Sequence, residues 1–537
     1  MNSKFSRSNF LKFIGFGFLA LTGGISLKKL LFSKKEIEGK IHGADFNTGH
    51  LLRKALTNKP EIFEEIETLI IGGGMSGLSA GWWFSKNNYN SYKILEMENK
   101  PGGNSKGGEN EISKFPWGAH YIPLPGINAK YVKELFEEFG IITGYKNEKP
   151  IYNDFYICSD PNERLYFQGR WHDGLIPNYG ISEEDHEQYK SFFSHIKDLK
   201  NKKGNDSKII FSIPMELSSQ DSNYLKLDTI SMFDYLNSNK WTSEYLHWYI
   251  NYCCRDDYGA SYKDVSAWAG LHYFCSRTGE GVNVEKGDVI TWPEGNEWIV
   301  EKLKEKNINN LVTNQLVYKI KPIKNEKFLV NVYDIKKDKV TQYITNHIIY
   351  SAPRFTAKYT IEGYSKKHQL EYNPWLVANI SLNNLPEGKG VPLSWDNVSY
   401  YSDSLGYIFA NHQDLTYNRN KGVITYYLPL DSKAGKDIRK EIIKYRSEDW
   451  KKIVLDDLER LHPGISKDII KIDFWVWGHG MISPGINYLW SKEREKMLES
   501  FNGIEFAHSD MSGISVFEEA QFRGCEAAKK ILRKVKV

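Results

Sequence analysis

The residues best suited to chemistry are three glycines, Gly72, Gly74 and Gly77, which follow the apolar run Leu69–Ile71 with the spacing G-x-G-x-x-G. The first allows a tight turn out of a buried strand, the second lets backbone N–H groups approach a pyrophosphate, and the third lets a helix pack close to the sheet. A phosphate beside Ser76 would lie at a helix N-terminus, where unpaired N–H groups favour an anion. The pattern predicts a dinucleotide-binding βαβ unit.

An acid and a glycine pair beyond this turn indicate which dinucleotide binds. Glu96 ends the next apolar run and lies 19 residues beyond Gly77, close to the roughly 20 expected for an acid that accepts hydrogen bonds from the adenosine ribose. Gly102 and Gly103 follow, and a glycine pair lets a loop pass close to a diphosphate. A plain surface turn is the alternative for the pair alone. Together with Glu96, the pair favours FAD over NAD.

The far end of the chain supplies the second half of the expected site. Residues 504–510 read as a short buried strand that ends in Asp510, and residues 516–534 read as a helix. An acid at a strand end beside a helix N-terminus can bind the ribityl chain of FAD, and the helix can aim amide donors at the isoalloxazine ring. Each half is ambiguous alone, and together they predict one FAD held by distant parts of the chain.

These segments resemble the flavin-containing amine oxidase superfamily, which includes monoamine and polyamine oxidases, protoporphyrinogen oxidase and phytoene desaturases. The matching segments are residues 70–81, 95–104, 506–510 and 524–528, with weaker matches at 292–298, 314–320 and 348–355. The resemblance implies that the backbone of Val317 meets the adenine and that Asp510 meets the ribityl chain. Asn104 stands where many members have arginine, which puts one diphosphate or flavin contact in doubt. No cysteine resembles the covalent attachment site of monoamine oxidases, so noncovalent FAD is expected.

The fold class expected is α/β, with a discontinuous Rossmann-like FAD-binding domain and an inserted α+β substrate domain. The FAD-binding domain is expected at residues 65–125, 285–355 and 495–537. The substrate domain is expected at residues 126–284 and 356–494, and a linker at residues 36–64. The length of 537 residues suits two domains and an extension.

Residues 1–35 read as an export signal or membrane anchor. An apolar run from Phe13 to Leu27 has basic flanks, and its opening is similar to a twin-arginine signal with Ser8 in place of the second arginine. The run of about 15 residues is shorter than the roughly 20 that span a bilayer. We expect an exported, periplasmic or membrane-associated protein whose N-terminal segment is either cleaved or kept as a tether.

Charge and cysteine content exclude other classes. The net charge of +4 arises at the N-terminus, because residues 1–54 carry ten Lys or Arg against three Asp or Glu, a local charge of +7. The rest of the chain is slightly acidic, which argues against a nucleic-acid partner. The five cysteines lack metal-ligand spacing and are odd in number, so neither a disulfide framework nor a metal site is expected.

The candidate catalytic residues are His120, Trp477 and His479. His120 follows the glycine pair at a distance that, in the similar family, brings the chain past the flavin, and an imidazole there can accept a substrate proton. Trp477 and His479 lie in an alternating, strand-like run. With Trp395 and Tyr400 or Tyr401, the tryptophan can form an aromatic wall around a cationic amine. A backbone-bonded histidine and ordinary hydrophobic core are the alternatives.

Two adjacent acids, Asp256 and Asp257, follow Arg255 and can bind a polyamine ammonium if they face the cleft. A helix cap or a structural ion pair is the alternative.

These observations predict an FAD-dependent oxidoreductase that transfers a hydride from a small-molecule amine, including polyamines, to FAD and passes electrons to oxygen or a quinone. An FAD-dependent desaturase or dehydrogenase of an apolar or porphyrin-like substrate is the alternative enzyme. An NAD-linked dehydrogenase and a membrane-tethered flavoprotein with a binding role are the alternatives from other classes. The sequence does not predict the oligomeric state.

Overall fold

The computed structural model describes residues 37–54, 56, 58–365, 370–414 and 420–535. Gly39–Val537 forms one compact unit. The expected export signal or anchor, residues 1–35, lies outside the described residues. Within the described ranges, every helix is too short or too polar to span a bilayer.

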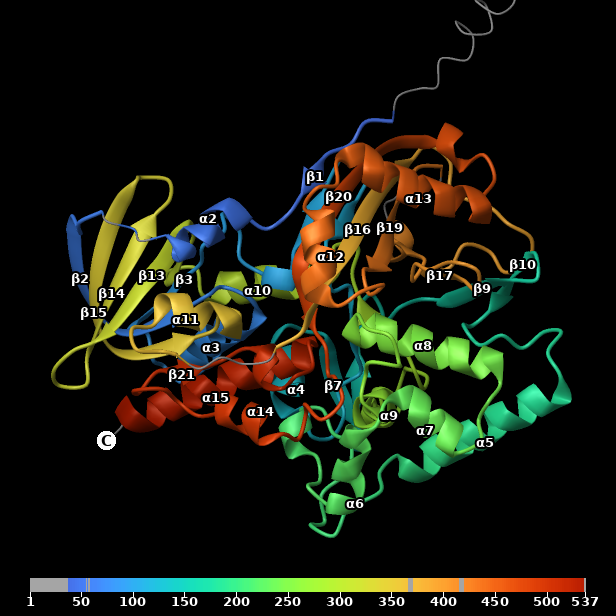
Figure 1. Ribbon diagram of the computed structural model, residues 1–537, viewed down its shortest axis with the longest axis horizontal. Helices are drawn as coiled ribbons and strands as arrows, with labels where there is room; N and C mark the ends of the chain where they lie inside the picture. Colours follow the sequence, from blue (N-terminus) through green and yellow to red (C-terminus); the bar gives the residue numbers. More distant parts are fainter. Residues whose placement is uncertain (1–36, 55, 57, 366–369, 415–419, 536–537) are drawn as a thin grey trace, which may run out of the picture. The chain divides into compact units, whose positions relative to one another are not determined.

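A seven-stranded sheet gathers three distant parts of the chain (Figure 1, left). Its path runs β12 (Leu311–Val312), β3 (Tyr92–Leu95), β2 (Ile62–Ile71), β15 (Lys339–Tyr350), β14 (Phe328–Asp334) and β13 (Gln315–Pro322), with β21 (Glu505–Phe506) paired to β15. β2 pairs in parallel with β3 and β15, and β13, β14 and β15 form an antiparallel meander. Leu69, Ile70 and Ile71 are buried, because a parallel strand covered on both faces is apolar throughout.

Helices α3 (Met75–Lys86) and α15 (Phe517–Val535) pack against each other on this sheet. The approach is close because a Cβ atom at Gly524 would overlap the carbonyl oxygen of Ser76. Helices α10 (Glu297–Lys306) and α4 (Lys130–Glu138) share the same apolar core. Helix α15 therefore supports helix α3 on the sheet.

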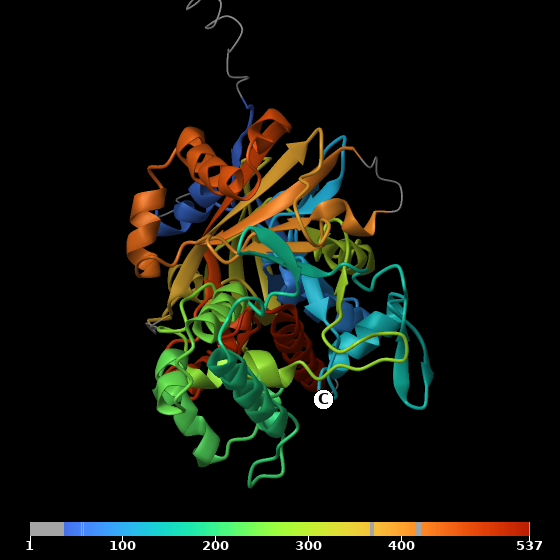
Figure 2. The ribbon, with the colours of Figure 1, turned by 90° about the vertical axis from the view of Figure 1, so that its right-hand side faces the viewer.

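The second sheet has eight strands, and its strand β20 carries Trp477 and His479. Its order is β1 (Ile41–His42), β20 (Ile469–Ile482), β16 (Tyr372–Leu382), β19 (Gly422–Pro429), β18 (Tyr407–Phe409), β17 (Asp396–Ser399), β9 (Glu163–Phe167) and β10 (Arg170–Asp173). Helices α12 (Gly435–Ile442) and α13 (Ser447–Leu461) pack on it and are the orange helices of Figure 2.

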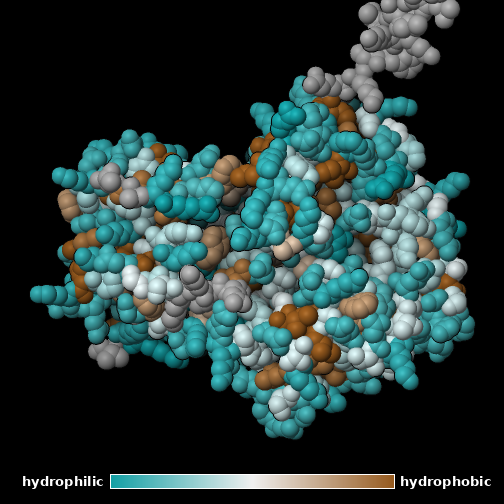
Figure 3. All heavy atoms as spheres, in the orientation of Figure 1, coloured by the Kyte–Doolittle hydropathy of each residue, from teal (hydrophilic) through white to brown (hydrophobic). Residues whose placement is uncertain are grey.

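A helical layer completes the substrate side and has its own apolar core. It consists of α5 (Glu183–Leu199), α6 (Ser222–Leu225), α7 (Met232–Ser238), α8 (Glu244–Tyr258) and α9 (Ala267–Ser276). The face drawn in Figure 3 is mainly hydrophilic, with apolar side chains in small groups. Such scattered groups are normal on a protein surface.

The segment expected as a linker contains regular structure. Strand β1 pairs in parallel with β20, with Ile41 opposite Phe474, and is followed by helix α2 (Phe46–His50). The backbone N–H of Asp45 donates to Glu98 Oε1 at 2.7 Å. Residues 39–54 therefore join the second sheet to the loop that follows β3.

Candidate active site

The glycine turn forms a cradle at the N-terminus of α3. Gly72 has φ of 106°, a conformation that favours glycine, and a Cβ atom at Gly77 would overlap the Gly72 carbonyl oxygen. Among the described residues no side chain caps this helix, and the buried Ser76 hydroxyl has no hydrogen-bond partner. The first N–H groups of α3 are therefore left for an anion.

The glycine pair lies directly against this turn. The Gly102 N–H donates to the Gly73 carbonyl at 2.9 Å, and Gly74 and Gly102 form a parallel bridge. A Cβ atom at Gly103 would lie 3.5 Å from Gly74 Cα, and Gly103 and Asn104 keep exposed surface. We call residues 72–77 and 102–104 together the phosphate cradle.

Glu96 lies at the end of β3 beside the cradle, as the sequence predicts. Its carboxylate accepts the Gly73 N–H at 2.6 Å and the Glu98 N–H at 2.8 Å. Burial raises the pKa of Glu96, although both hydrogen bonds oppose the rise. Each carboxylate oxygen can accept a second hydrogen bond, so the group can also take the two hydroxyls of a ribose.

Val317 lies near Glu96 through the start of β13, because the Gln315 N–H donates to the Glu96 carbonyl at 2.8 Å. The pairing of β13 with β14 is irregular between Val317 and Lys319. Such an irregularity locally disrupts the ladder and frees backbone groups for another partner. This geometry suits a backbone contact to an adenine.

Asp510 is 2% exposed and lies in the turn between β21 and α15. Its carboxylate accepts the Arg354 N–H at 2.9 Å and the Tyr372 hydroxyl at 2.6 Å, and Oδ1 lies 3.1 Å from His508 Nδ1. Burial alone would raise the pKa of Asp510, but His508 and these hydrogen bonds outweigh it and lower the pKa. Asp510 is therefore an ionised acceptor fixed by protein donors.

These residues fit FAD. The uncapped end of α3 suits a diphosphate, Glu96 suits a ribose, and Asp510 presents an ionised carboxylate where the ribityl chain is expected. The five cysteines are buried free thiols.

Loop 117–121 connects the cradle to the substrate side. The Ala119 N–H donates to the Asn104 carbonyl at 3.0 Å, and the Asn104 amide donates to the Gly480 carbonyl. Trp477 donates its indole N–H to the Trp117 carbonyl at 2.6 Å. Trp117, the first residue of this loop, lines a cavity of about 580 Å³ together with Glu98 and Lys106. Asn104 therefore hydrogen-bonds to backbone groups of Ala119 and Gly480, at the position where many members of the similar family have an arginine.

His120 lies among aromatic rings. Its ring is 4.6 Å from that of Tyr427 and 5.5 Å from that of Trp395, centroid to centroid. Burial lowers the pKa of His120 to about 4, so the imidazole is neutral at pH 7 and a weak proton acceptor. We call His120, Trp395 and Tyr427 the aromatic wall.

The other two candidate catalytic residues, His479 and Trp477, lie in different surroundings. The His479 ring stacks on Phe355 at 4.6 Å and is 5.5 Å from Tyr372, the partner of Asp510. Burial lowers the pKa of His479 to about 4 as well. Trp477 packs in the same apolar cluster as Trp395 and Tyr427. The structure therefore places Trp477 near the aromatic wall and His479 on the Asp510 side.

Three acids gather beside the aromatic wall. Glu163 on β9 and Asp396 on β17 are direct partners on neighbouring parallel strands, and Asp256 lies on α8. The Tyr252 hydroxyl donates to Asp396 at 3.3 Å, and the Tyr121 hydroxyl donates to Asp256 at 3.2 Å. Like charges placed opposite each other on adjacent strands are destabilising unless a proton or cation intervenes. We call Glu163, Asp256 and Asp396 the acidic site.

The acids show this repulsion in their pKa values. Burial, with Asp257 close by, raises the pKa of Asp256 to about 7. Burial and the two other acids raise the pKa of Asp396 well above its usual range. Glu163 is nevertheless exposed and the other two are half-buried, so small solutes reach them. A bound cation would relieve the repulsion.

The other acid of the sequence pair has a different role. Asp257 forms an ion pair with Arg277, and Arg255 pairs with Asp431 at 2.8 Å. Of the predicted polyamine ligands, only Asp256 belongs to the acidic site. Sequence reasoning missed Glu163 and Asp396, because their pairing depends on strand register; the only signal was an acid at the start of each strand.

The cradle lies in a segment that is similar to known dinucleotide-binding domains. Residues 70–139, which include the whole cradle, match the family of NAD(P)-binding Rossmann-like domains.

The chain is also similar in sequence to an individual oxidoreductase. The chain is 22% identical over 291 residues to oxidoreductase PigB of Serratia sp. (strain ATCC 39006), and the alignment covers 50% of this chain and 41% of PigB. The chain thus matches less than half the length of that relative.

Two solved structures share the fold. A putrescine oxidase bound to putrescine superimposes with a TM-score of 0.64 at 14% identity, over 88% of this chain and 100% of that one. A CLA-producing fatty acid isomerase from P. acnes superimposes with a TM-score of 0.58 at 17% identity, over 88% and 99%. The expected α/β fold with a Rossmann-like domain is confirmed, and at these identities the likeness to the two structures is a likeness of fold.

Proposed function

We propose that this protein is an FAD-dependent oxidoreductase that oxidises an amine. The observation that carries the proposal is the acidic site beside the aromatic wall, reached from the phosphate cradle through loop 117–121. When bound, FAD supplies a hydride acceptor. The chain has a fold similar to that of a putrescine oxidase, and this similarity supports the proposed amine chemistry.

The chain's own residues would bind and orient the amine. The acidic site holds an ammonium, and a cation there favours the ionised form of Asp256, whose pKa of about 7 allows it to give up or take a proton at neutral pH. The aromatic wall excludes water and favours the neutral form of the reacting nitrogen. His120 is neutral, so its part is to shape the wall.

The test is anaerobic titration of the purified yellow protein with putrescine. Loss of the oxidised-flavin absorbance is expected, and Asp396→Asn should raise the putrescine concentration needed for half reduction about tenfold, because one of the carboxylates that would hold the ammonium is lost. The exposed Asp403→Asn is the control. A colourless protein, or one that no amine reduces, would refute the proposal.

An apolar substrate is the second candidate. The fold likeness to a fatty acid isomerase favours it, as does the aromatic character of the apolar cluster around Trp395 and Trp477. Reduction by an unsaturated fatty acid but by no amine would establish this reading in place of the first. Oxygen or a quinone as the electron acceptor belongs to either proposal and is tested by reoxidation with each.

We also propose export or membrane association, supported by the apolar run and basic flanks within residues 1–35. Cell fractionation of the full chain, compared with a chain lacking residues 1–35, tests it. Equal recovery of both in the cytoplasmic fraction would refute it.

A further inference from the structure

The phosphate cradle contributes no positive charge to the anion that it would hold. Its side chains are those of Met75, Ser76 and Asn104, and the cation that follows it, Lys106, lies 3.6 Å from the carboxylate of Glu98. Backbone N–H groups alone would therefore have to balance the charge of a diphosphate. A cation from another part of the chain would stabilise it.

A short segment near the N-terminus crosses beside the cradle. It consists of α2 and the 3-10 helix η1 (Leu51–Arg53), and we call residues 45–53 the strap. At its start, its first N–H group donates to Glu98, as described above. A Cβ atom at Gly49 would lie 3.9 Å from the sulfur of Met97 in the same loop after β3. The first part of the strap is therefore fixed beside the expected ribose site.

The other end of the strap lies on the Asp510 side. Helix η1 lies against α11 (Ala357–Thr360), and α11 closely follows Arg354, whose backbone N–H donates to Asp510. The strap thus runs from the ribose end of the expected cofactor toward its ribityl end. In FAD, the diphosphate joins these two parts.

Arg53, at the end of the strap, lies near the stretch of β20 that contacts the cradle. Burial and the positive charges of Arg439 and Arg53 lower the pKa of His479, so the Arg53 guanidinium is close enough to act on this ring. Gly480, the next residue, accepts a hydrogen bond at its carbonyl from the Asn104 amide. Three segments that border the cradle therefore lie beside the strap.

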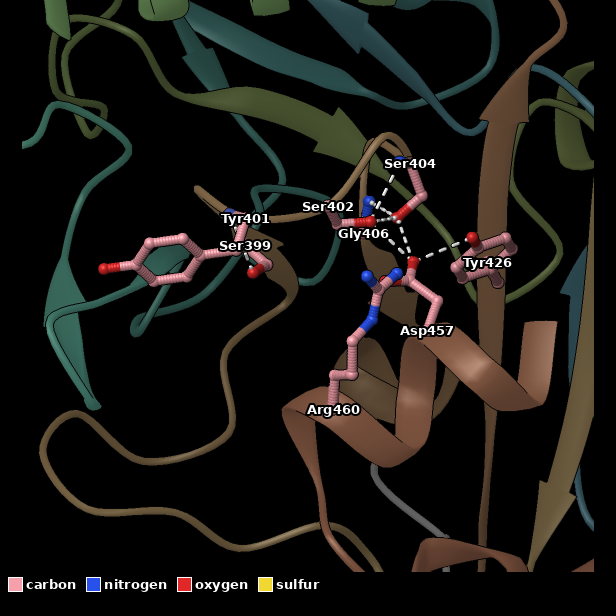
Figure 4. A network of polar contacts seen from close by, with 8 residues as sticks. All are labelled: Ser399, Tyr401, Ser402, Ser404, Gly406, Tyr426, Asp457 and Arg460. Carbon is pink, nitrogen blue, oxygen red and sulfur yellow. Dashed lines mark hydrogen bonds and ion pairs between the residues drawn. The ribbon is translucent and has the colours of Figure 1, made fainter. Parts of the chain in front are cut away.

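The Arg53 guanidinium differs from another exposed arginine in its partners. Arg460 of α13 pairs with Asp457 at 3.1 Å (Figure 4). Asp457 also accepts hydrogen bonds from Ser402 at 2.5 Å and Ser404 at 2.9 Å, so this cluster is satisfied within the protein. Arg53 is exposed, and within the described ranges its side chain makes no ion pair or hydrogen bond. Its charge is available to an anion.

We propose that the strap is part of the cofactor site and that the Arg53 guanidinium binds the diphosphate of FAD. The proposal rests on FAD as the cofactor of the proposed function, and it adds a binding element from a segment that precedes β2. A guanidinium offers paired N–H donors that match phosphate oxygens. Because the cofactor and the strap bind each other, FAD also holds the strap in place.

The first test measures the release of FAD from the holoenzyme on dilution, by the rise in flavin fluorescence. Arg53→Gln should raise the dissociation constant for FAD about threefold to tenfold, because a partly exposed charge-assisted hydrogen bond is lost. Lys54→Gln is the matched control, because it removes the same charge from the next exposed residue and should have little effect. Equal effects of the two variants would overturn the proposal.

Hydrogen exchange of the strap gives a second measurement that does not depend on turnover. In the holoenzymes, the amides of residues 45–53 should exchange faster in Arg53→Gln than in Lys54→Gln, since the cofactor no longer holds the strap. Arg53→Lys, which keeps the charge, should give an intermediate rate. The same exchange rate in all three variants and the parent would count against the proposal.

These measurements separate the strap from the proposed function. If no amine reduces the flavin, amine oxidation fails, and FAD release still decides the role of Arg53. If the protein purifies without flavin, the proposed function fails, and calorimetric titration with ADP tests the strap instead. Weaker ADP binding to Arg53→Gln than to Lys54→Gln would then support the contact with a diphosphate, whereas equal binding, or none to the parent, would overturn it.

Discussion

The phosphate cradle is made by the backbone, whereas the acidic site is made by side chains from separate segments. In the cradle, Gly72 and Gly77 act by having no side chain, and the groups left to bind a phosphate are backbone N–H groups at the N-terminus of α3. In the acidic site, Glu163, Asp256 and Asp396 come from two strands and a helix. The cradle does not tolerate a side chain at Gly72 or Gly77. In the acidic site, by contrast, substitution of a single acid can change which ligand is preferred.

The largest expected effect is in the cradle. Gly77→Ala should destabilise the fold by at least about 3 kcal/mol and abolish flavin retention, because the new Cβ meets the backbone oxygen of Gly72, which cannot move without opening the turn. Gly144→Ala is the control, since no atom lies within 4 Å of its Cβ position. Urea unfolding and flavin content measure both. If the free energy of unfolding of Gly77→Ala is within about 1 kcal/mol of the parent value, the glycine turn can rearrange around the added Cβ atom, contrary to the prediction.

A smaller effect is expected at Asp510, where the candidate cofactor site depends on a side chain. Asp510→Asn should cost about 1–3 kcal/mol, because the amide cannot accept from all the donors that surround the carboxylate. The lowered pKa of Asp510 means that the parent gains stability from this group above pH of about 4 and loses it as the pH falls through the lowered pKa. The variant should therefore lose less stability in acid. Thermal unfolding against pH measures this, and identical acid profiles would contradict it.

The smallest expected effect lies in the acidic site and has the opposite sign. Because the pKa of Asp256 is raised to about 7, the group favours folding below its ordinary pKa of about 4, and this contribution is lost as the pH rises through about 7. Asp256→Asn should flatten the decline of Tm across that window without lowering Tm at neutral pH. A steeper decline in the variant would mean that Asp256 is stabilised as an anion. Adding putrescine should raise the Tm of the parent more than that of the variant.

The two regions also differ in what the sequence could predict. The glycine turn and Glu96 were predicted because their spacing along the chain sets their geometry. The discontinuous cofactor domain was expected from the resemblance and not from local spacing, since Ile62 pairs with Thr341 and Ile349 with Glu505, 279 and 156 positions apart.

The substrate end depends on information that no local pattern holds. Asp396 meets Glu163 only through strand register, and a shift of one residue would turn each to the other face. Asp256 and Asp257 are adjacent, yet one faces the acidic site and the other pairs with Arg277. Strand β1, inside the expected linker, is two residues long and forms only because β20 offers an edge.

The packing of α15 on α3 sets an order of events during synthesis. Gly524 meets Ser76 across the helix pair, and β21 completes the pairing of β15. A nascent chain that has left the ribosome up to residue 500 holds the glycine turn but lacks the helix behind it, and domains generally fold as units. Loading of the cofactor is therefore expected only after α15 has been synthesised and packed on α3.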